Sequence, residues 1–570
     1  MLDIFETNDV KKFFPLPEFR DGQETAIKFA TNAFNAGKKI VVLEVPTGGG
    51  KSAIGMTIAN MVEKSYYLTV TKILQDQLMN DFGDFLIDLK GRSAYECDIY
   101  ERQGEHMLKA GVLTKSELEE KRSYYVDCNS GYCRTNKGRE DGHKSKRCFL
   151  ESPAPNVPKG MLNILPEGRR FSACSYYDQV FRAIEHEKVC MNFHSFIYQT
   201  IMSHRFTSRD LMIIDEAHSI ESVLMDVISF SLSSAIFNKH NIDLPVFNSI
   251  DDYLNWFKEE EILKKIALMH EKAKQEEDAD AAEDLARLCK RVMKFEETVQ
   301  DTEWVVQIDE DKRTEQEIIV TFKPVQVKHY GNDMLFKYGE KVLLMSATIL
   351  DPDVFCRSLG IHKDDVAFYK MRNRFPVENR KIFINNCGSL TGGKAKMDQW
   401  MPNVIDTVEN ILAKHQGCRG IIHTHNFAIM EGLLDGCAPK HRERFITQKD
   451  YPDKKILLEQ HAKRQDSVIV APAMHEGIDL KDELSRFQVI AKVPYPNFFD
   501  DLQLNRRNQI DPNYISWLVA LKLVQSYGRS IRGPQDYADT YIIDGSIYGF
   551  VKRNRRMLPA WFLEAFQEVI

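Results

Sequence analysis

Residues 39–52, KIVVLEVPTGGGKS, constrain the fold of this chain more than any other stretch. The apolar, β-branched run predicts a buried strand, the glycines predict a turn, and SAIGMTIANMVEK predicts a helix. A strand, a glycine-rich turn and a helix in this order form a phosphate-binding loop on a parallel sheet. The stretch departs from the pattern G-x-x-x-x-G-K-[ST] at its first position, where Val45 replaces glycine.

The residues of this loop have the chemistry that a nucleoside triphosphate requires. Gly48, Gly49 and Gly50 have no β-carbon, so their backbone N–H groups can surround phosphate oxygens. Lys51 is expected to reach the β and γ phosphates, and the Ser52 hydroxyl is expected to hold Mg²⁺. An ordinary glycine-rich turn is the alternative interpretation of the loop considered alone.

A second motif lies far downstream, at residues 211–218, LMIIDEAH. Its apolar run predicts a strand that ends at Asp215 and Glu216. A strand-end aspartate such as Asp215 can hold Mg²⁺ through water, and Glu216 can orient and deprotonate the attacking water. An Asp-Glu pair at a strand end is common on its own, but together with Lys51 it favours a site for nucleotide hydrolysis.

A third motif, QSYGRSIRG, contains Gln525, Arg529 and Arg532. Two arginines three residues apart lie on one face of a helix, where they can stabilise the charge of a γ-phosphate in the transition state. Arginines supplied from a second domain would make hydrolysis depend on domain closure. A solvated basic helix face is the alternative for this motif alone.

Length and charge set broader limits. At 570 residues the chain is too long for one hydrophobic core, and we expect about three or four domains. The N-terminal MLDIFETNDVKKFF lacks a signal-peptide pattern, and no apolar run reaches about 18 residues, so we expect a cytoplasmic, non-secreted protein. The net charge of −7 argues against a surface that is basic throughout, but it permits a local nucleic-acid groove.

Five of the eleven cysteines lie in one segment of the chain, and their function is open to several interpretations. They are Cys97, Cys128, Cys133, Cys148 and Cys174. Disulfides, a metal site, a redox switch or a chance cluster in a loop could each account for them. Disulfides require an oxidising compartment, so the expected cytoplasmic location favours metal binding over disulfide formation. Thiolates suit Zn²⁺ or an iron–sulfur cluster, and the long irregular gaps fit a cluster better than the paired ligands of a zinc module.

The motifs, in this order, resemble those of superfamily 2 helicases, and further stretches resemble the XPD/DinG branch. FRDGQETAI is similar to an N-terminal element of that branch, and EVPTGGGKS is similar to its loop, which also lacks the first glycine. The similarity continues through TVTKILQDQL, CMNFHSFIY, LLMSATIL and HEGIDLKDELSRFQVIAKVPYPN. The resemblance implies that Gln23 and Thr47 contact the nucleotide. It implies DNA-contact or coupling roles for Thr71, Asn192, His218, Ser346, Thr348, Glu476 and Asp479.

The resemblance implies an α/β fold with two RecA-like P-loop motor domains, in agreement with the alternating strand and helix patterns. It also implies two insertions in the first motor domain, namely an iron–sulfur cluster domain and a helical arch domain. Apolar residues at helical spacing in DDYLNWFKEEEILKKIALMHEKA support the second. The expected boundaries are 1–90 for the first part of helicase domain 1, 91–174 for the cluster domain, 175–225 for the DEAH part, 226–335 for the arch, 336–352 for the Ser-Ala-Thr strand and 353–570 for helicase domain 2.

The resemblance further implies a [4Fe–4S] cluster with four cysteine ligands. Cys97 and Cys174 match the elements that bear the first and last ligands, and Cys148 is the third candidate. Cys128 and Cys133 compete for the remaining place, and the glycine-containing GYC favours Cys133 slightly. The other cysteine is expected to be spare.

The implied activity is ATP-dependent DNA unwinding, with 5′→3′ translocation on single-stranded DNA. ATP, Mg²⁺ and the [4Fe–4S] cluster are the implied cofactors, and single-stranded and forked DNA are the implied partners of a monomer. DNA repair or replication, in a nucleoid or a nucleus, is the implied setting. Two alternatives remain open: an ATP-driven nucleoprotein remodeller without processive unwinding, and a non-catalytic cluster-bearing scaffold or redox sensor.

Overall fold

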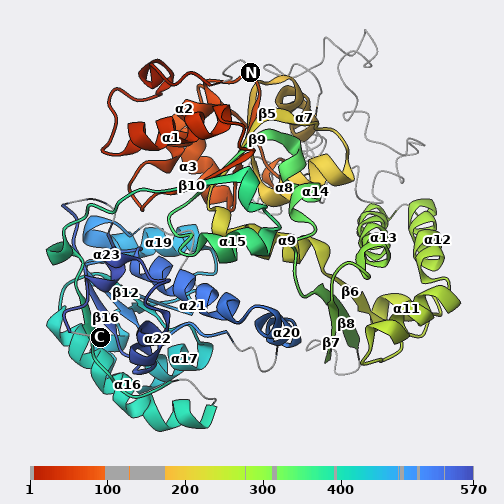
Figure 1. The fold of residues 1–570 in the computed structure, drawn as a ribbon. Coiled ribbons are helices and arrows are strands. Elements are labelled where there is room, and N and C mark those ends of the chain that lie inside the picture. Colours follow the sequence, from red (N-terminus) through yellow and green to blue (C-terminus); the bar gives the residue numbers. More distant parts are fainter. Residues whose placement is uncertain are drawn as a thin grey trace, which may run out of the picture.

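The computed structural model describes residues 5–96, 128, 174–276, 278–310, 317–390, 394–472, 474, 480–496, 501–531, 533 and 535–568. Two lobes built on separate sheets lie at the top and at the lower left of Figure 1, and a third unit lies at the right. Among the helices in these ranges, none is both long and apolar enough to cross a membrane.

The first lobe is built on a seven-stranded sheet in which every pairing is parallel. Across the sheet the strands are β10 (Val366–Lys370), β1 (Ile40–Glu44), β9 (Gly339–Ser346), β5 (Arg209–Ile214), β2 (Ser65–Thr69), β4 (Lys188–Asn192) and β3 (Ile87–Leu89). All five residues of β1 are buried, which explains its continuous apolar run, because both faces of the sheet are covered. The carboxyl ends of these parallel strands meet at one edge, where ligands of open α/β sheets bind.

Helices cover both faces of this sheet and enclose a separate core on each. One face packs α1 (Gln23–Asn35), α2 (Lys51–Ala59) and α3 (Lys72–Phe82). The other face packs α7 (Ser175–Glu185), α8 (Phe193–Ile197), α9 (Ile220–Ile228) and α15 (Pro352–Leu359). The short α14 (Gly331–Met334) precedes β9.

The second lobe is built on a six-stranded sheet whose pairings are also all parallel. Its strands are β11 (Ile382–Ile384), β16 (Asp539–Ile542), β15 (Phe487–Ile490), β12 (Gly420–His423), β14 (Val468–Ala471) and β13 (Phe445–Ile446). Its helices are α16 (Lys394–Lys414), α17 (Phe427–Gly436), α18 (Pro439–Arg442), α19 (Lys454–Lys463), α20 (Leu502–Ile510), α21 (Pro512–Tyr527), α22 (Ser546–Asn554) and α23 (Ala560–Leu563). The predicted pair of parallel-sheet lobes is therefore confirmed.

The third unit combines helices with a small antiparallel sheet. The helices are α10 (Ser234–Asn238), α11 (Ile250–Glu259), α12 (Ile262–Gln275) and α13 (Ala279–Thr298). The strands lie in the order β6 (Phe230–Ser233), β8 (Ile318–Pro324) and β7 (Trp304–Glu310). The sequence analysis predicted only helices here. It missed the strands, whose buried residues alternate and whose Phe230 and Phe322 rings stack with centroids 4.7 Å apart.

One predicted boundary differs from the structure. The sequence analysis began the second motor domain at residue 353, but β10 pairs with β1 in the first sheet. The first sheet therefore continues to Lys370, because the chain adds one more parallel strand before it crosses to the second lobe. The second sheet begins only at β11.

Candidate nucleotide site

The loop between β1 and α2 adopts a conformation that requires glycine. Gly48 and Gly50 have φ angles of 78° and 77°, in the left-handed region that other residues rarely adopt. A β-carbon on Gly49 would lie 2.7 Å from Val45 Cγ1. The loop therefore folds tightly against its own strand, and it places Lys51 at the first position of α2. Backbone N–H groups at such a helix start suit phosphate.

Two residues upstream of the loop support its backbone. Gln23 Nε2 donates to the carbonyl oxygen of Gly50 at 3.2 Å, and Arg20 Nη1 donates to that of Gly48 at 2.9 Å. Gln23 Oε1 accepts from the backbone N–H of Arg20 at 2.7 Å. Gln23, a predicted nucleotide contact, thus touches the phosphate-binding loop itself. Arg20, which belongs to the same FRDGQETAI element but had no predicted role, supports the loop in the same way.

The carboxylates that follow β5 face the loop. Lys51 Nζ lies 3.6 Å from Glu216 Oε1, and both side chains are mostly buried. Burial raises the pKa of Asp215 to about 6; Lys51 opposes this rise and Glu216 adds to it. A cation bound next to Asp215 would offset the free energy lost when its charged carboxylate is buried. Carboxylate and hydroxyl oxygens, here those of Asp215 and Ser52, are ligands that Mg²⁺ prefers, so the residues fit the expected metal.

Tyr67, on β2, is a neighbour of this site that the sequence analysis missed. Its side chain is fully buried, and burial raises the pKa of its hydroxyl well above the ordinary value, to which Asp215 contributes. The Ser52 hydroxyl lies near enough to oppose this rise. The tyrosine sits in an apolar strand run, where periodicity gives no signal of a polar role.

A chain of hydrogen bonds runs from the carboxylates to the second lobe. His218 Nδ1 lies 2.8 Å from Ser346 Oγ, and Ser346 Oγ accepts from the backbone N–H of Thr348 at 3.1 Å. Gln525 Nε2, at the end of α21, donates to Thr348 Oγ1 at 3.2 Å. The structure therefore brings together four residues, from three separate motifs, that were predicted to be catalytic or coupling residues.

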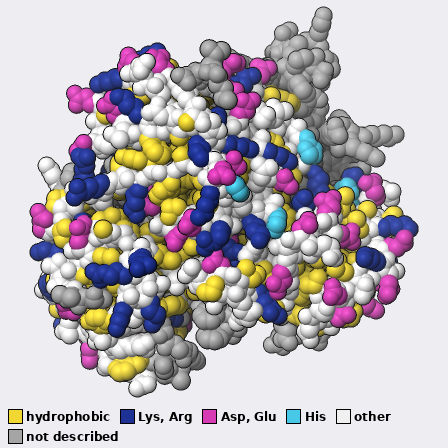
Figure 2. Space-filling view, viewed as in Figure 1, with side chains coloured by type: hydrophobic (Ala, Val, Ile, Leu, Met, Phe, Trp, Pro, Cys, Tyr) yellow, Lys and Arg dark blue, Asp and Glu magenta, His cyan; other side chains and the backbone are white. Residues whose placement is uncertain are grey.

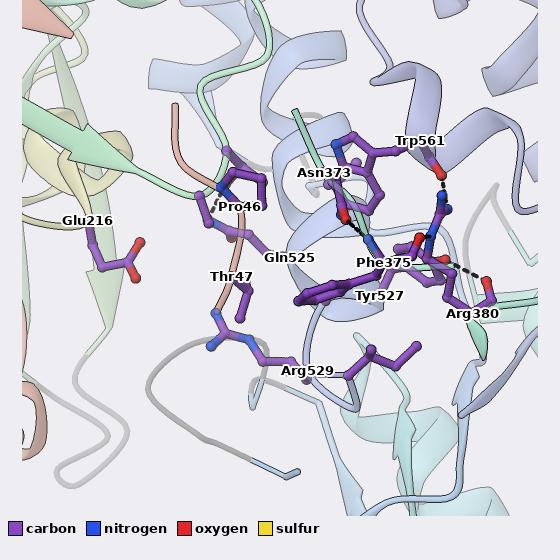
Figure 3. Close-up of a pocket in the computed structure, with 15 residues that line it drawn as sticks. Pro46, Thr47, Glu216, Asn373, Phe375, Arg380, Gln525, Tyr527, Arg529 and Trp561 are labelled. Carbon is purple, nitrogen blue, oxygen red and sulfur yellow. Dashed lines mark hydrogen bonds between the residues drawn. The ribbon is translucent and has the colours of Figure 1, made fainter. Parts of the chain in front are cut away.

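A pocket between the lobes is lined by residues from both walls (Figure 3). Pro46, Thr47 and Glu216 come from the first lobe, and Gln525 and Arg529 come from the second. The Arg529 guanidinium group lies beside Thr47 in Figure 3. Its predicted neighbour Arg532 lies outside the described residues.

The far end of the pocket is aromatic, and the sequence analysis did not predict it. Phe375, Tyr527 and Trp561 line this end, and the Tyr527 and Trp561 rings stack with centroids 5.7 Å apart. Arg380 fixes the wall by donating to the carbonyl oxygens of Phe375 and Trp561 and by pairing with Glu564. These residues come from the segment between the lobes and from the C-terminal helices, so no single stretch of sequence contains the pattern.

Two predicted DNA-contact residues begin helices at the carboxyl edge of the first sheet. Thr71 Oγ1 accepts from the Leu74 N–H at 3.3 Å and caps α3. Asn192 Oδ1 accepts from the Ser195 N–H at 2.8 Å and caps α8. Both helix starts follow adjacent strands, β2 and β4. Glu476 and Asp479, from the same set of predictions, lie outside the described residues.

Two of the five clustered cysteines are described, and Cys128 contacts the same backbone carbonyl as Ser175, the residue after Cys174. Cys128 Sγ lies 3.1 Å from the carbonyl oxygen of Glu96, and Ser175 Oγ, next to Cys174, lies 3.0 Å from the same oxygen. Cys128 is buried and Cys174 is half-buried. Within the described ranges, no group of three or more His, Cys, Asp or Glu side chains could hold a metal ion. Cys97, Cys133 and Cys148 lie outside those ranges.

Three family models match the chain. Residues 16–145 match Type III restriction enzyme, res subunit; residues 106–237 match DEAD_2; and residues 408–565 match Helicase C-terminal domain. These ranges contain Lys51, Asp215 and Arg529, the central residues of the three motifs.

Two sequence relatives match a short part of the chain. The ATP-dependent DNA helicase CHL1 of Candida albicans is 30% identical over 93 residues, which are 13% of this chain and 11% of that protein. The CHL1 protein of Kluyveromyces lactis is 31% identical over 93 residues, with shares of 13% and 12%. The matches span about a tenth of the length of these relatives.

Solved structures match nearly the whole chain. An XPD helicase superposes with a TM-score of 0.61 and 13% identity, over 95% of this chain and 98% of that chain. The S. tokodaii Xpd4 structure superposes with a TM-score of 0.54 and 13% identity, over 97% and 100% of the two chains. At this identity the likeness concerns the fold, and it confirms the predicted fold class.

Proposed function

We propose that this chain, which has the fold of an XPD-like superfamily 2 helicase, hydrolyses ATP between its lobes and uses the energy to move along DNA. The observation that carries the proposal is the hydrogen bond of 3.2 Å between Gln525 and Thr348 across that cleft. It connects the wall that bears Lys51 and Glu216 to the wall that bears Arg529. A site assembled from two lobes suits a reaction that is coupled to their relative motion.

Each side chain of the site has a separate role in phosphoryl transfer. Lys51 binds the β and γ phosphates, while Ser52 and Asp215 would hold Mg²⁺. The ion supplies neutralisation of the phosphate charge when it is bound. Glu216 orients the attacking water and accepts its proton, and the Lys51 ammonium lies 3.6 Å from this carboxylate. Arg529, with Arg532, stabilises the charge that develops on the γ-phosphate.

The chain of hydrogen bonds from His218 through Ser346 and Thr348 to Gln525 carries the state of the nucleotide to the second lobe. A change at the γ-phosphate moves Glu216, and His218 Nδ1 lies 3.5 Å from Glu216 Oε2. Because each member touches the next, the lobes respond as one unit. Both walls of the cleft come from a single chain, which supports action as a monomer.

We infer that single-stranded DNA is the track and that movement is 5′→3′, as the resemblance implies. Thr71 and Asn192 would meet the strand at the edge of the first sheet, with Glu476 and Asp479 on the second lobe. Figure 2 shows Lys and Arg side chains over the middle of this face, where the lobes meet, with Asp and Glu side chains among them. Basic side chains in this place can attract phosphates although the net charge of the chain is −7. The domain assignments of the sequence analysis, including a cluster domain and an arch, belong to this proposal.

We also propose a [4Fe–4S] cluster held by Cys97, Cys148, Cys174 and one of Cys128 or Cys133. The sequence analysis leaned towards Cys133, but the contacts of Cys128 support the other choice. Its thiol and the hydroxyl next to Cys174 share the Glu96 carbonyl, and Glu96 directly precedes Cys97. Three candidate ligands are thus adjacent in chain or in space.

The motor assignment is tested by ATP turnover and by strand displacement. Lys51→Ala is expected to reduce DNA-stimulated ATP hydrolysis at least about 100-fold, because the β and γ phosphates lose their cation. The same variant should not separate a forked duplex. Lys38→Ala is a matched control, because Lys38 lies before β1, at the opposite end of the strand. Normal turnover by Lys51→Ala would contradict the site.

The cluster is tested by iron and sulfide analysis after anaerobic purification. Cys128→Ser is expected to lose most of the iron, whereas Cys133→Ser should retain about four irons per chain. The visible absorbance of the cluster should fall in proportion to the loss of iron. Loss of iron in Cys133→Ser, with iron retained in Cys128→Ser, would identify Cys133 as the fourth ligand. One zinc per chain in the wild type would contradict the proposed cluster.

A further inference from the structure

The helices α20 and α21 of the second lobe lie against the first lobe and the third unit (Figure 1), and only the end of α21 lines the nucleotide pocket. Trp517 Nε1 on α21 donates to the carbonyl oxygen of Ile349 at 2.8 Å. Asp511, between the two helices, pairs with Arg357 on α15 at 3.0 Å. Gln503 Nε2 on α20 donates to the carbonyl oxygen of Val325 at 2.9 Å. The two helices therefore join three units of the molecule.

A buried ion pair lies at the centre of this contact. Arg507 Nη2, on α20, lies 3.4 Å from Glu221 Oε1, on α9, and the two side chains are 2% and 7% exposed. The Arg507 guanidinium carbon lies 4.3 Å from the centre of the Tyr514 ring on α21. The groups that act on the Glu221 carboxyl are Arg507, the Ser358 and Tyr514 hydroxyls, and the Asp511 carboxylate. An acidic and a basic side chain at this depth are retained at a desolvation cost, which calls for an explanation beyond stability.

The packing around the pair is incomplete. A cavity of about 330 Å³ lies between the lobes, and its lining includes Glu221, Tyr514 and Trp517. It extends to His218 on one wall and to Gln525 on the other. Buried side chains of α21, among them Tyr514 and Trp517, share one apolar core with α9 and α15, but the cavity leaves part of this contact without packing. Along that part, directional contacts such as the ion pair add to the packing.

Both members of the pair lie one element away from the nucleotide site. Glu221 lies in the first turn of α9, directly after the turn that bears Glu216 and His218. Arg507 precedes α21, whose last turn bears Gln525. A shift of α20 and α21 along α9 would therefore change the separation between Glu216 on one wall and Gln525 on the other.

We propose that Glu221 and Arg507 are positioning residues. Their ion pair sets the position of α20 and α21 on α9 and so aligns the two walls of the nucleotide site. The proposal rests on the proposed ATPase function of that site. The attraction within a buried ion pair weakens as soon as the two side chains separate, whereas apolar side chains can slide past each other with little change in contact energy. Misplacement of a catalytic group by about 1 Å can cost about 100-fold in rate.

The test compares Arg507→Met, the double variant Glu221→Gln/Arg507→Met and the wild type, each as the full chain with its iron. Steady-state ATP hydrolysis with single-stranded DNA gives kcat and KM. We expect kcat to fall at least about tenfold in both variants, with KM for ATP changed less than about threefold. The double variant removes both charges, so its melting temperature should recover towards that of the wild type while its kcat does not.

A matched control is the neighbouring arginine on the same helix. Arg506 is half exposed and lies 3.6 Å from Glu303, so Arg506→Met removes an equal charge without touching Glu221. We expect wild-type kcat and KM for this variant. A double variant with wild-type kcat would overturn the proposal, because the pair would then be structural only.

A second measurement does not depend on ATP turnover. Hydrogen–deuterium exchange of the nucleotide-free chain should be at least about threefold faster in α9, α20 and α21 of the double variant than in those of Arg506→Met. Unchanged exchange in these helices would overturn the positioning role. If the wild type itself hydrolyses no ATP, the proposed function fails, and the exchange rates alone decide whether the pair sets the alignment.

Discussion

Two buried carboxylates flank the DEAH turn, and their surroundings give them different properties. Asp215 lies near Lys51, and its pKa is raised to about 6. Glu221 lies deeper between the lobes, and burial raises its pKa to about 7 although Arg507 opposes the rise. At the residue scale, burial therefore outweighs the partner cation in both cases. A cation bound beside Asp215 would lower its pKa, whereas Arg507 is the cationic side chain that opposes the rise in the pKa of Glu221.

The raised pKa of Glu221 predicts a pH-dependent stability. The folded chain holds this proton up to about pH 7, whereas the unfolded chain releases it near the ordinary value of 4.5. Stability from this group is therefore greatest at low pH and falls as pH rises between those values, by about 3 kcal/mol at most. Glu221→Gln removes the titration. Its melting temperature should fall less than that of the wild type between pH 5 and pH 8.

A matched control for this effect is Glu340→Gln. Glu340 lies on the exposed amino end of β9, far along the strand from Ser346. Its melting curves should follow those of the wild type at every pH. If the curves of Glu221→Gln also run parallel to those of the wild type, Glu221 does not titrate in this range.

At the scale of elements, the phosphate-binding loop depends on contacts with a neighbouring helix as well as on its own backbone. Gly50 has a φ angle of 77°, and a β-carbon there would lie 2.1 Å from Gln23 Nε2 on α1. Arg20 and Gln23 hold the loop by two carbonyl groups. The start of α2 is thus placed jointly by β1 and by α1.

Gly50→Ala is expected to weaken nucleotide binding at least about tenfold. The substitution adds the strain of a left-handed alanine, of order 1–2 kcal/mol, and displaces the Gln23 side chain from the Gly50 carbonyl. Fluorescence titration with a labelled ADP measures the change. Gly37→Ala is the matched control, because Gly37 has a φ angle of 94° but no atom within 4 Å of its added β-carbon. Equal affinities for the two variants would contradict the clash.

At the scale of the whole molecule, several polar contacts join the two lobes on both sides of a cavity. The Gln525–Thr348 hydrogen bond lies at the nucleotide pocket, at the end of α21, and the Arg507–Glu221 pair lies near the start of α21, beside Tyr514. The cavity between them is lined by residues of both lobes. The cavity leaves room for the lobes to move relative to each other, and the polar contacts beside it limit the direction of that motion.

Thr348→Val tests the contact at the pocket. Valine keeps the shape of threonine but removes the acceptor of Gln525 Nε2, while the backbone atoms that bond to Ser346 remain. We expect DNA-stimulated kcat to fall about tenfold with little change in KM for ATP, because the lobes lose a contact made at closure. Thr31→Val is the control, since the buried Thr31 hydroxyl bonds only within α1. An unchanged kcat would show that the contact does not couple the lobes.

Local sequence was sufficient where the chemistry is local. KIVVLEVPTGGGKS specifies a buried strand, left-handed glycines and a helix start, because these depend on neighbouring residues. LMIIDEAH likewise specifies a strand that ends at two carboxylates. The alternation in IIVTFKP was present but was not recognised as a strand, because the surrounding helical periodicity was stronger.

The sequence by itself determined which side chains could act on a nucleotide and in which order they occur along the chain. Only the tertiary structure decided that β10 completes the first sheet, that Thr348 meets Gln525, and that Arg507 reaches Glu221. These contacts join residues far apart in sequence, and they depend on strand order and helix packing rather than on spacing. The contact of Cys128 Sγ with the Glu96 carbonyl oxygen has the same origin, since no local sequence pattern predicts it.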